Sequence, residues 1–163
     1  MNQADVTHVQ KACAYITRNG NELLVFEGPG HEGLQIPKGT LEEGERPREA
    51  LFREIVEESG LAGVGPTRHV ASDVWTRRES PPKRYVRHFF HTSVYEPRDE
   101  WTHIVTGDGE ERGAAFEFSW LELPADREFA LDLDDYTHLL ADPSPTPEST
   151  EPAASVAVEP TSD

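Results

Sequence analysis

Hydrophobic and polar positions alternate along much of the chain in the pattern of short β-strands. Two such runs are separated by Arg18-Asn19-Gly20-Asn21, and Asn-Gly is a strong signal for a hairpin turn. Two longer runs flank Pro81-Pro82, which predicts a second hairpin. The predicted strands cover residues 9–17, 22–27, 34–36, 69–76, 84–95 and 115–123.

Two segments have the pattern of helices instead. Residues 46–59 form the clearer one, because Pro47 suits the first turn of a helix and Gly60 suits the position just after its end. A shorter helix is predicted over residues 133–141, with Asp132 as its cap. Strands outnumber helices and do not alternate with them, which predicts an α+β fold with a mixed β-sheet rather than repeated βαβ units.

Composition changes the picture near the C-terminal end. Residues 142–163 contain five prolines and no basic or aromatic residue. Such a segment cannot bury enough apolar surface to offset its loss of conformational entropy. We therefore expect a folded domain over residues 1–141 and a disordered acidic tail, rich in Pro, Ser and Thr, over residues 142–163.

The chain is strongly acidic. It has 163 residues, with 15 basic and 31 acidic side chains and a net charge of −16. A field this negative argues against general nucleic-acid binding and against polybasic membrane attachment. No stretch has the pattern of a signal sequence or a membrane span, so we expect a cytoplasmic protein. A single cysteine, Cys13, excludes an internal disulfide, and the sequence specifies no oligomeric state.

The predicted helix carries a cluster of carboxylates. At about 100° per residue, Glu54, Glu57 and Glu58 share one arc, next to an apolar arc that can pack on a sheet. Three like charges repel each other unless a cation compensates them, and carboxylates suit hard cations such as Mg²⁺. A solvated acidic face is the alternative interpretation. Gly39 allows close approach of a ligand, and Arg53 can hold a carboxylate in a bidentate pair.

Residues 39–61, GTLEEGERPREALFREIVEESGL, resemble the Nudix box G-x5-E-x7-R-E-U-x-E-E-x-G-U, in which U is aliphatic. All nine fixed positions are filled, by Gly39, Glu45, Arg53, Glu54, Ile55, Glu57, Glu58, Gly60 and Leu61. Nine residues at fixed spacing are far more specific than a short motif. The resemblance implies a Nudix-like α/β/α sandwich. It also implies a Nudix pyrophosphohydrolase, which hydrolyses a nucleoside diphosphate linked to another group.

The resemblance further implies roles for individual residues. The expected ligands of Mg²⁺ or Mn²⁺ are Glu54, Glu57, Glu58 and the backbone carbonyl of Gly39. Arg53 and Glu45 are expected to orient the site, and the expected catalytic residues are Glu57, Arg53 and Glu54. Glu57 is the first candidate for the general base. Outside the box, Glu111 in the acidic loop 107–113 is a second candidate, with a solvated loop as the alternative.

Two further features bear on the substrate. Lys38 belongs to a Pro-Lys-Gly lead-in similar to that of hydrolases of dinucleoside and diphosphoinositol polyphosphates. Arg84 and Arg87 belong to a basic, aromatic hairpin that suits a phosphate-rich ligand with a stackable base, or else is only a solubilising surface. His31, Trp75 and Trp101 are weaker candidates for the lining of a pocket. We expect a phosphorylated small molecule as the substrate, with dinucleoside polyphosphates as the first choice.

Other functions stay open at this point. A Nudix-fold module can sense a nucleotide without hydrolysing it, although such modules usually lose box glutamates or the arginine. A prenyl diphosphate isomerase can share the fold, although the intact box argues against it. For a hydrolase, diphosphoinositol polyphosphates and nucleoside triphosphates are the alternative substrates.

Overall fold

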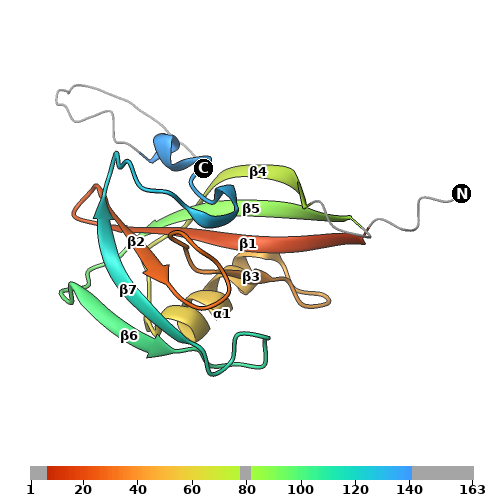
Figure 1. Ribbon diagram of the computed structural model, residues 1–163, viewed down its shortest axis with the longest axis horizontal. Coiled ribbons are helices and arrows are strands. Elements are labelled where there is room, and N and C mark those ends of the chain that lie inside the picture. The colour runs from red at the N-terminus through yellow and green to blue at the C-terminus, as the bar shows by residue number, and fades with distance from the viewer. Residues whose placement is uncertain (1–6, 78–81, 141–163) are drawn as a thin grey trace, which may run out of the picture.

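The computed structural model describes residues 7–77 and 82–140. Within these residues the chain forms one seven-stranded mixed sheet, and one α-helix packs on a face of that sheet (Figure 1). The strands are β1 (Thr7–Arg18), β2 (Glu22–Glu27), β3 (Lys38–Thr40), β4 (Arg68–Arg77), β5 (Lys83–Ser93), β6 (Glu100–Ile104) and β7 (Ala115–Glu122). The helix is α1 (Pro47–Ser59). The predicted tail and the tip of the second predicted hairpin lie outside the described residues.

The sheet has the order β4-β5-β1-β2-β7-β6, and β3 pairs with residues 11–13 of β1, whereas the start of β2 pairs with residues 17–18. Strands β1 and β5 are parallel, and the other neighbours are antiparallel. This topology confirms the predicted α+β fold with a mixed sheet. In the described residues, no helix is long and apolar enough to cross a membrane.

Each face of the sheet buries its own hydrophobic cluster, because successive side chains of a strand point to opposite faces. On the face of α1, the cluster includes Ala12, Ala14 and Phe26 from the sheet and Leu51 and Ile55 from the helix. On the opposite face, the cluster includes Cys13, Tyr15, Leu23, Phe89 and Leu133. The second cluster is covered by the chain after β7, drawn in blue in Figure 1.

The covering segment differs from the prediction. The helix expected over residues 133–141 is wrong, because the described part of this segment forms two short 3₁₀ turns, Ala130–Asp132 and Thr137–Leu139. Asp132 does not cap a helix but adopts a left-handed conformation, with φ 55°. The Tyr15 hydroxyl donates to the carbonyl of Leu133 over 2.7 Å. Tertiary contacts therefore satisfy groups that a helix would use within its own turns.

Most other predicted elements are confirmed with small shifts. The helix begins at Pro47 and ends at Ser59. The next residue, Gly60, has φ 78°, the left-handed conformation that favours glycine at this position. Residues 34–36 form only isolated bridges, and the strand that pairs with β1 follows them at Lys38–Thr40. Strand β6 was not predicted.

Candidate active site

Helix α1 buries a narrower face than its sequence suggested. Leu51 and Ile55 pack against the sheet, but Phe52 and Val56 are 45% and 48% exposed. Glu58 lies one turn beyond Ile55 on the same side of the helix, and its side chain is therefore buried with a residual exposure of 1%. The packing of the helix on the sheet therefore buries the carboxylate of Glu58.

The buried Glu58 carboxylate is only partly satisfied. Its Oε1 accepts a hydrogen bond from the backbone N–H of Lys38 over 3.1 Å, whereas no described residue forms a hydrogen bond with Oε2. Burial raises the pKa of Glu58 well above its ordinary value, and the carboxyl groups of Glu111 and Glu54 add to the effect. A buried, unpaired carboxylate oxygen is costly, which points to a ligand at this position.

Arg53 links the other carboxylates of the box. Its Nε and Nη2 donate to both oxygens of Glu45 over 2.8 and 2.9 Å, and its Nη1 donates to Glu54 over 2.7 Å and to Glu57 over 3.4 Å. The hydrogen bond from Arg53 lowers the pKa of Glu45. Burial raises the pKa of Glu54 to about 6, against the opposing charge of Arg53. Arg53 therefore contacts three carboxylates of the box at once.

Two glycines allow the backbone to approach these carboxylates. A Cβ atom at Gly39 would overlap the carboxylate of Glu54, and one at Gly107 would overlap that of Glu57. The loop after β6 is also tied to the helix, because the N–H of Thr106 donates to the carbonyl of Glu57 over 3.0 Å. Glu111 comes to the site from this loop, close enough to raise the pKa of Glu58.

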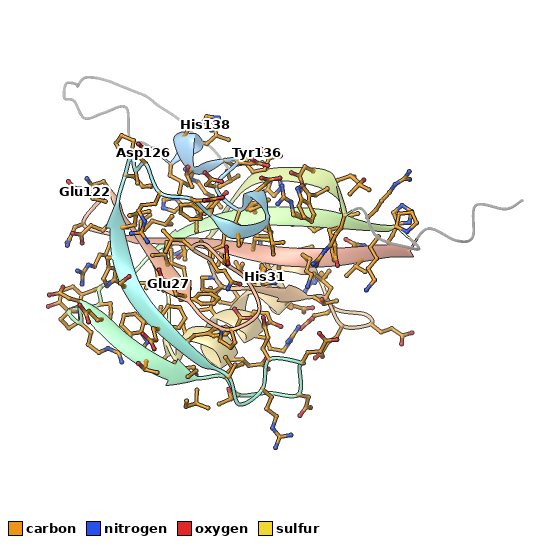
Figure 2. All side chains as sticks on the ribbon, viewed as in Figure 1. Glu27, His31, Glu122, Asp126, Tyr136 and His138 are labelled. Atoms are coloured by element: carbon orange, nitrogen blue, oxygen red, sulfur yellow. The ribbon has the colours of Figure 1, made fainter. Side chains whose placement is uncertain are left out.

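The carboxylates open into a cavity of about 630 Å³. Of the predicted site residues, Gly39, Arg53, Glu54, Glu57, Glu58, Lys38, Arg87 and Glu111 line this cavity. Glu45 does not line the cavity, but its carboxylate accepts two hydrogen bonds from Arg53. His31, on the loop after β2 (Figure 2), and Trp75 also line it. Trp101 does not, because its indole N–H donates to the carbonyl of Ser59 and its ring packs in the core.

The two arginines of the predicted basic hairpin have different positions. Arg84 alternates with the cavity-lining residues of β5 and therefore lies on the other face of the sheet, away from the cavity. Arg87 faces the cavity but is 3% exposed, and it binds Asp73 through Nε and Nη2 over 2.9 and 2.6 Å. Its Nη1 donates to the carbonyl of Leu131 over 2.9 Å. The prediction that Arg84 lines the substrate site is therefore wrong. Arg87 borders the cavity, but its guanidinium is occupied by contacts within the fold.

The cavity is also lined by Lys11 on β1, Arg77 on β4, and Lys83 and Tyr85 on β5. The last three belong to the basic, aromatic hairpin that the sequence indicated, whereas Lys11 was not predicted. The available signal was strand alternation, because a lysine on the apolar face of the first predicted strand is unusual. The pairing of β1 with β5 cannot be seen in the sequence, and it is this pairing that brings these side chains together.

The donors fit a hard divalent cation. The cavity is lined by the carboxylates of Glu54, Glu57, Glu58 and Glu111 and by Gly39, and one Glu58 oxygen lacks a hydrogen-bond partner among the described residues. Within the described ranges, no three acidic, histidine or cysteine side chains are already arranged as a closed ligand set. Arg53 instead engages Glu54 and Glu57, so these two would have to share their oxygens between Arg53 and a cation.

Comparison with known proteins places the chain in a family. The family model described as the NUDIX domain matches residues 7–140. An RNA pyrophosphohydrolase of Psychrobacter sp. (strain PRwf-1) is 41% identical over 84 residues, which cover 49% of this chain and 46% of the relative. Another from Actinobacillus succinogenes is 42% identical over 73 residues, covering 45% and 36%. The chain thus spans less than half the length of these curated relatives.

Solved structures agree on the fold. A MutT structure from work on Aliivibrio salmonicida and Vibrio cholerae covers 83% of this chain and 98% of its own, with a TM-score of 0.58 and 17% identity. The MutT protein of Bacillus halodurans covers 82% and 83%, with a TM-score of 0.57 and 17% identity. The family model matches residues 7–140, and the chain carries the complete box at residues 39–61. The chain therefore belongs to the NUDIX domain family.

Proposed function

We propose that this protein hydrolyses a pyrophosphate bond in a nucleotide-linked polyphosphate with the help of Mg²⁺ or Mn²⁺. The observation that carries the proposal is one cavity lined by two chemically different sets of side chains. Four glutamate carboxylates line it together with basic and aromatic side chains. Such a cavity suits a substrate whose phosphates meet metal ions while its nucleoside meets aromatic rings.

The chain's own residues would act as follows. Glu54, Glu57 and Glu58, with the carbonyl of Gly39, would hold the cation, which would supply charge neutralisation of the phosphate oxygens and a more acidic water. Arg53 fixes the orientation of Glu54 through a contact of 2.7 Å and is itself held by Glu45. A carboxylate oxygen of Glu57 accepts the proton of the attacking water. Glu111 is the alternative base, because it reaches the same cavity from the loop after β6.

Two substrate classes share the required chemistry. A dinucleoside polyphosphate is the first, since its chain of phosphates and its bases could meet both the glutamates and the basic and aromatic side chains of the cavity. The 5′-triphosphate end of an RNA is the second, and it is favoured by relatives that are named RNA pyrophosphohydrolases. The net charge of −16 opposes binding along an RNA backbone, so only the terminal nucleotides would be recognised.

The test compares Glu57→Gln and Glu111→Gln with the wild type on diadenosine tetraphosphate, 5′-triphosphorylated RNA and ADP-ribose. We expect cleavage of a pyrophosphate bond that needs Mg²⁺, followed through the nucleotide products, and a loss of turnover by about 10²-fold or more in Glu57→Gln, because Gln removes the charge but keeps the shape. The melting temperature controls for folding. Absence of hydrolysis with every substrate would support a nucleotide-sensing module instead, and a loss only in Glu111→Gln would move the base to the loop.

A further inference from the structure

Three cationic side chains lie side by side on the cavity face of the sheet. Lys11 on β1 is directly opposite Arg87 on β5. On the other side of β1, Cys13 is opposite Lys38 on β3, so Lys38 is the diagonal neighbour of Lys11. All three side chains line the same cavity as the box glutamates. Three adjacent strands, β5, β1 and β3, thus present a row of positive charge.

The three cations differ in their partners. Arg87 is satisfied by Asp73, by Asp135 over 3.1 Å and by backbone carbonyls. The Lys11 ammonium lies 5.7 Å from the ring centre of Tyr85, and in the described part of the chain it forms no ion pair. The ammonium of Lys38 donates to the uncharged amide oxygen of Gln35 over 3.3 Å. Two neighbouring ammonium groups therefore face the cavity, and neither forms an ion pair within 4 Å among the described residues.

The electrostatics of the cavity agree with this arrangement. Burial lowers the pKa of Lys11 and the charge of Lys38 lowers it further, while Glu111 and Glu58 oppose this shift to a smaller extent. Burial also lowers the pKa of His31, and Lys38 and then Arg77 add to the effect, against a smaller opposing effect of Glu111. Lys38 is thus the charged side chain with the largest effect on the pKa of both Lys11 and His31. Like charges that are partly withdrawn from water destabilise each other unless an anion binds between them.

We propose that Lys11 and Lys38 form an anion subsite that binds a phosphate group of the substrate beyond the two phosphates joined by the scissile bond. This inference rests on the proposed function, and it makes Lys11 a specificity-determining residue. The subsite is continuous with the glutamates, because the backbone N–H of Lys38 binds Glu58 while its side chain extends into the cavity. Substrates with three or more phosphates would reach both sites, and substrates with two would not.

The test measures binding of methylene-bridged, non-hydrolysable analogues of ATP and ADP to Lys11→Met by calorimetry with Mg²⁺. Met keeps the length of the side chain and removes its charge. Loss of one charge-assisted contact should weaken binding of the triphosphate analogue by about tenfold or more and change that of the diphosphate analogue by less than about twofold. With diadenosine tetraphosphate, KM should rise by a similar factor while kcat stays nearly constant.

Three variants control this experiment. Lys11→Arg keeps the charge and should bind both analogues like the wild type. Lys38→Met removes the second ammonium, should show the same selectivity for the triphosphate analogue, and provides an independent test if Lys11→Met does not fold. Arg84→Met removes one charge from β5 on the far face of the sheet and should change neither affinity.

The outcomes separate the two proposals. If Lys11→Met and Lys38→Met weaken both analogues equally or neither, the anion subsite is refuted, whatever the hydrolytic activity. If the wild type hydrolyses none of the nucleotides but the variants still discriminate between the analogues, the hydrolase proposal fails and the subsite is supported. If Arg84→Met has the same effect as Lys11→Met, the selectivity reflects net charge alone and the subsite is refuted.

Discussion

The buried carboxyl of Glu58 should destabilise the protein whenever no cation binds it. Glu58 is 1% exposed, its Oε2 has no hydrogen-bond partner in the described part of the chain, and Glu54 and Glu111 are close enough to raise its pKa further. We therefore expect Glu58→Gln to be more stable than the wild type in EDTA. The same substitution should abolish stabilisation by Mg²⁺, because it removes a charged ligand.

The increase in stability expected for Glu58→Gln follows from the contacts of this side chain. Gln fills the same volume, its amide oxygen can still accept from the N–H of Lys38, and its NH₂ can donate toward Glu111. Removing an unsatisfied buried polar group is worth about 1–3 kcal/mol. For a domain of this size, that corresponds to a rise in melting temperature of about 3–10 °C.

The gain should also depend on pH. Because the pKa of Glu58 is raised in the folded state, the native protein binds more protons than the unfolded chain above the ordinary carboxyl pKa of 4.5. Its contribution to stability therefore becomes less favourable as the pH rises from 4.5 toward the folded pKa. The advantage of Glu58→Gln over the wild type in EDTA should grow across this range.

The assay is thermal unfolding followed by circular dichroism, in EDTA and in excess Mg²⁺. At a Mg²⁺ concentration of about 100 times Kd, binding should stabilise the wild type by about 2.7 kcal/mol and leave the variant unchanged. Glu43→Gln, in the exposed loop before the helix, makes the same charge change and should have little effect in either condition. A variant that is less stable than the wild type in EDTA, or that Mg²⁺ stabilises equally, would refute this account of Glu58.

Three further predictions concern stability. Arg87→Met should lower the free energy of unfolding by about 3–5 kcal/mol, because it leaves Asp73 without its bidentate partner. A loss below about 1 kcal/mol in urea titrations would contradict the structural role given to Arg87. Burial opposes ionisation of Asp73, but hydrogen bonds from Arg87 and Tyr136 outweigh it and lower its pKa below 3.8. This stabilisation should be present above pH 3.8 and be lost as the pH falls through the folded pKa, and Asp73→Asn should show no such loss in acid unfolding. A chain ending at Ala141 should keep the melting temperature within about 5 °C, because the residues removed are rich in Pro, Ser and Thr; a larger drop would show that they pack on the domain.

Local sequence signals were sufficient where local interactions dominate. Helix α1 was predicted almost to the residue, because Pro47 and Gly60 have conformational preferences that fix its two ends. Asn19 and Gly20 fixed the first hairpin for the same reason, since both adopt positive φ. The carboxylate cluster followed from the spacing of Glu54, Glu57 and Glu58 along one helix.

Local signals failed where distant side chains replace local hydrogen bonds. Residues 133–141 have a helical pattern, yet Tyr15 binds the carbonyl of Leu133, and Arg87 binds that of Leu131 just before it. Strand β6 was missed because it lies at the edge of the sheet and has only partly buried side chains, so its hydrophobic pattern is weak.

The sequence by itself determined the family, the glutamate helix and the alternation of faces within each strand. It could also place Arg84 and Arg87 on opposite faces, but only the tertiary structure decided which face borders the cavity. That decision depends on the parallel pairing of β1 with β5, a contact between segments about 75 residues apart that no local preference encodes. The same pairing places Lys11 beside Arg87, while Asp73 neutralises only the arginine. The positive charge of Lys11 at the cavity is therefore a product of the fold. Strand register decides which charged side chains become neighbours and which stay available to a ligand.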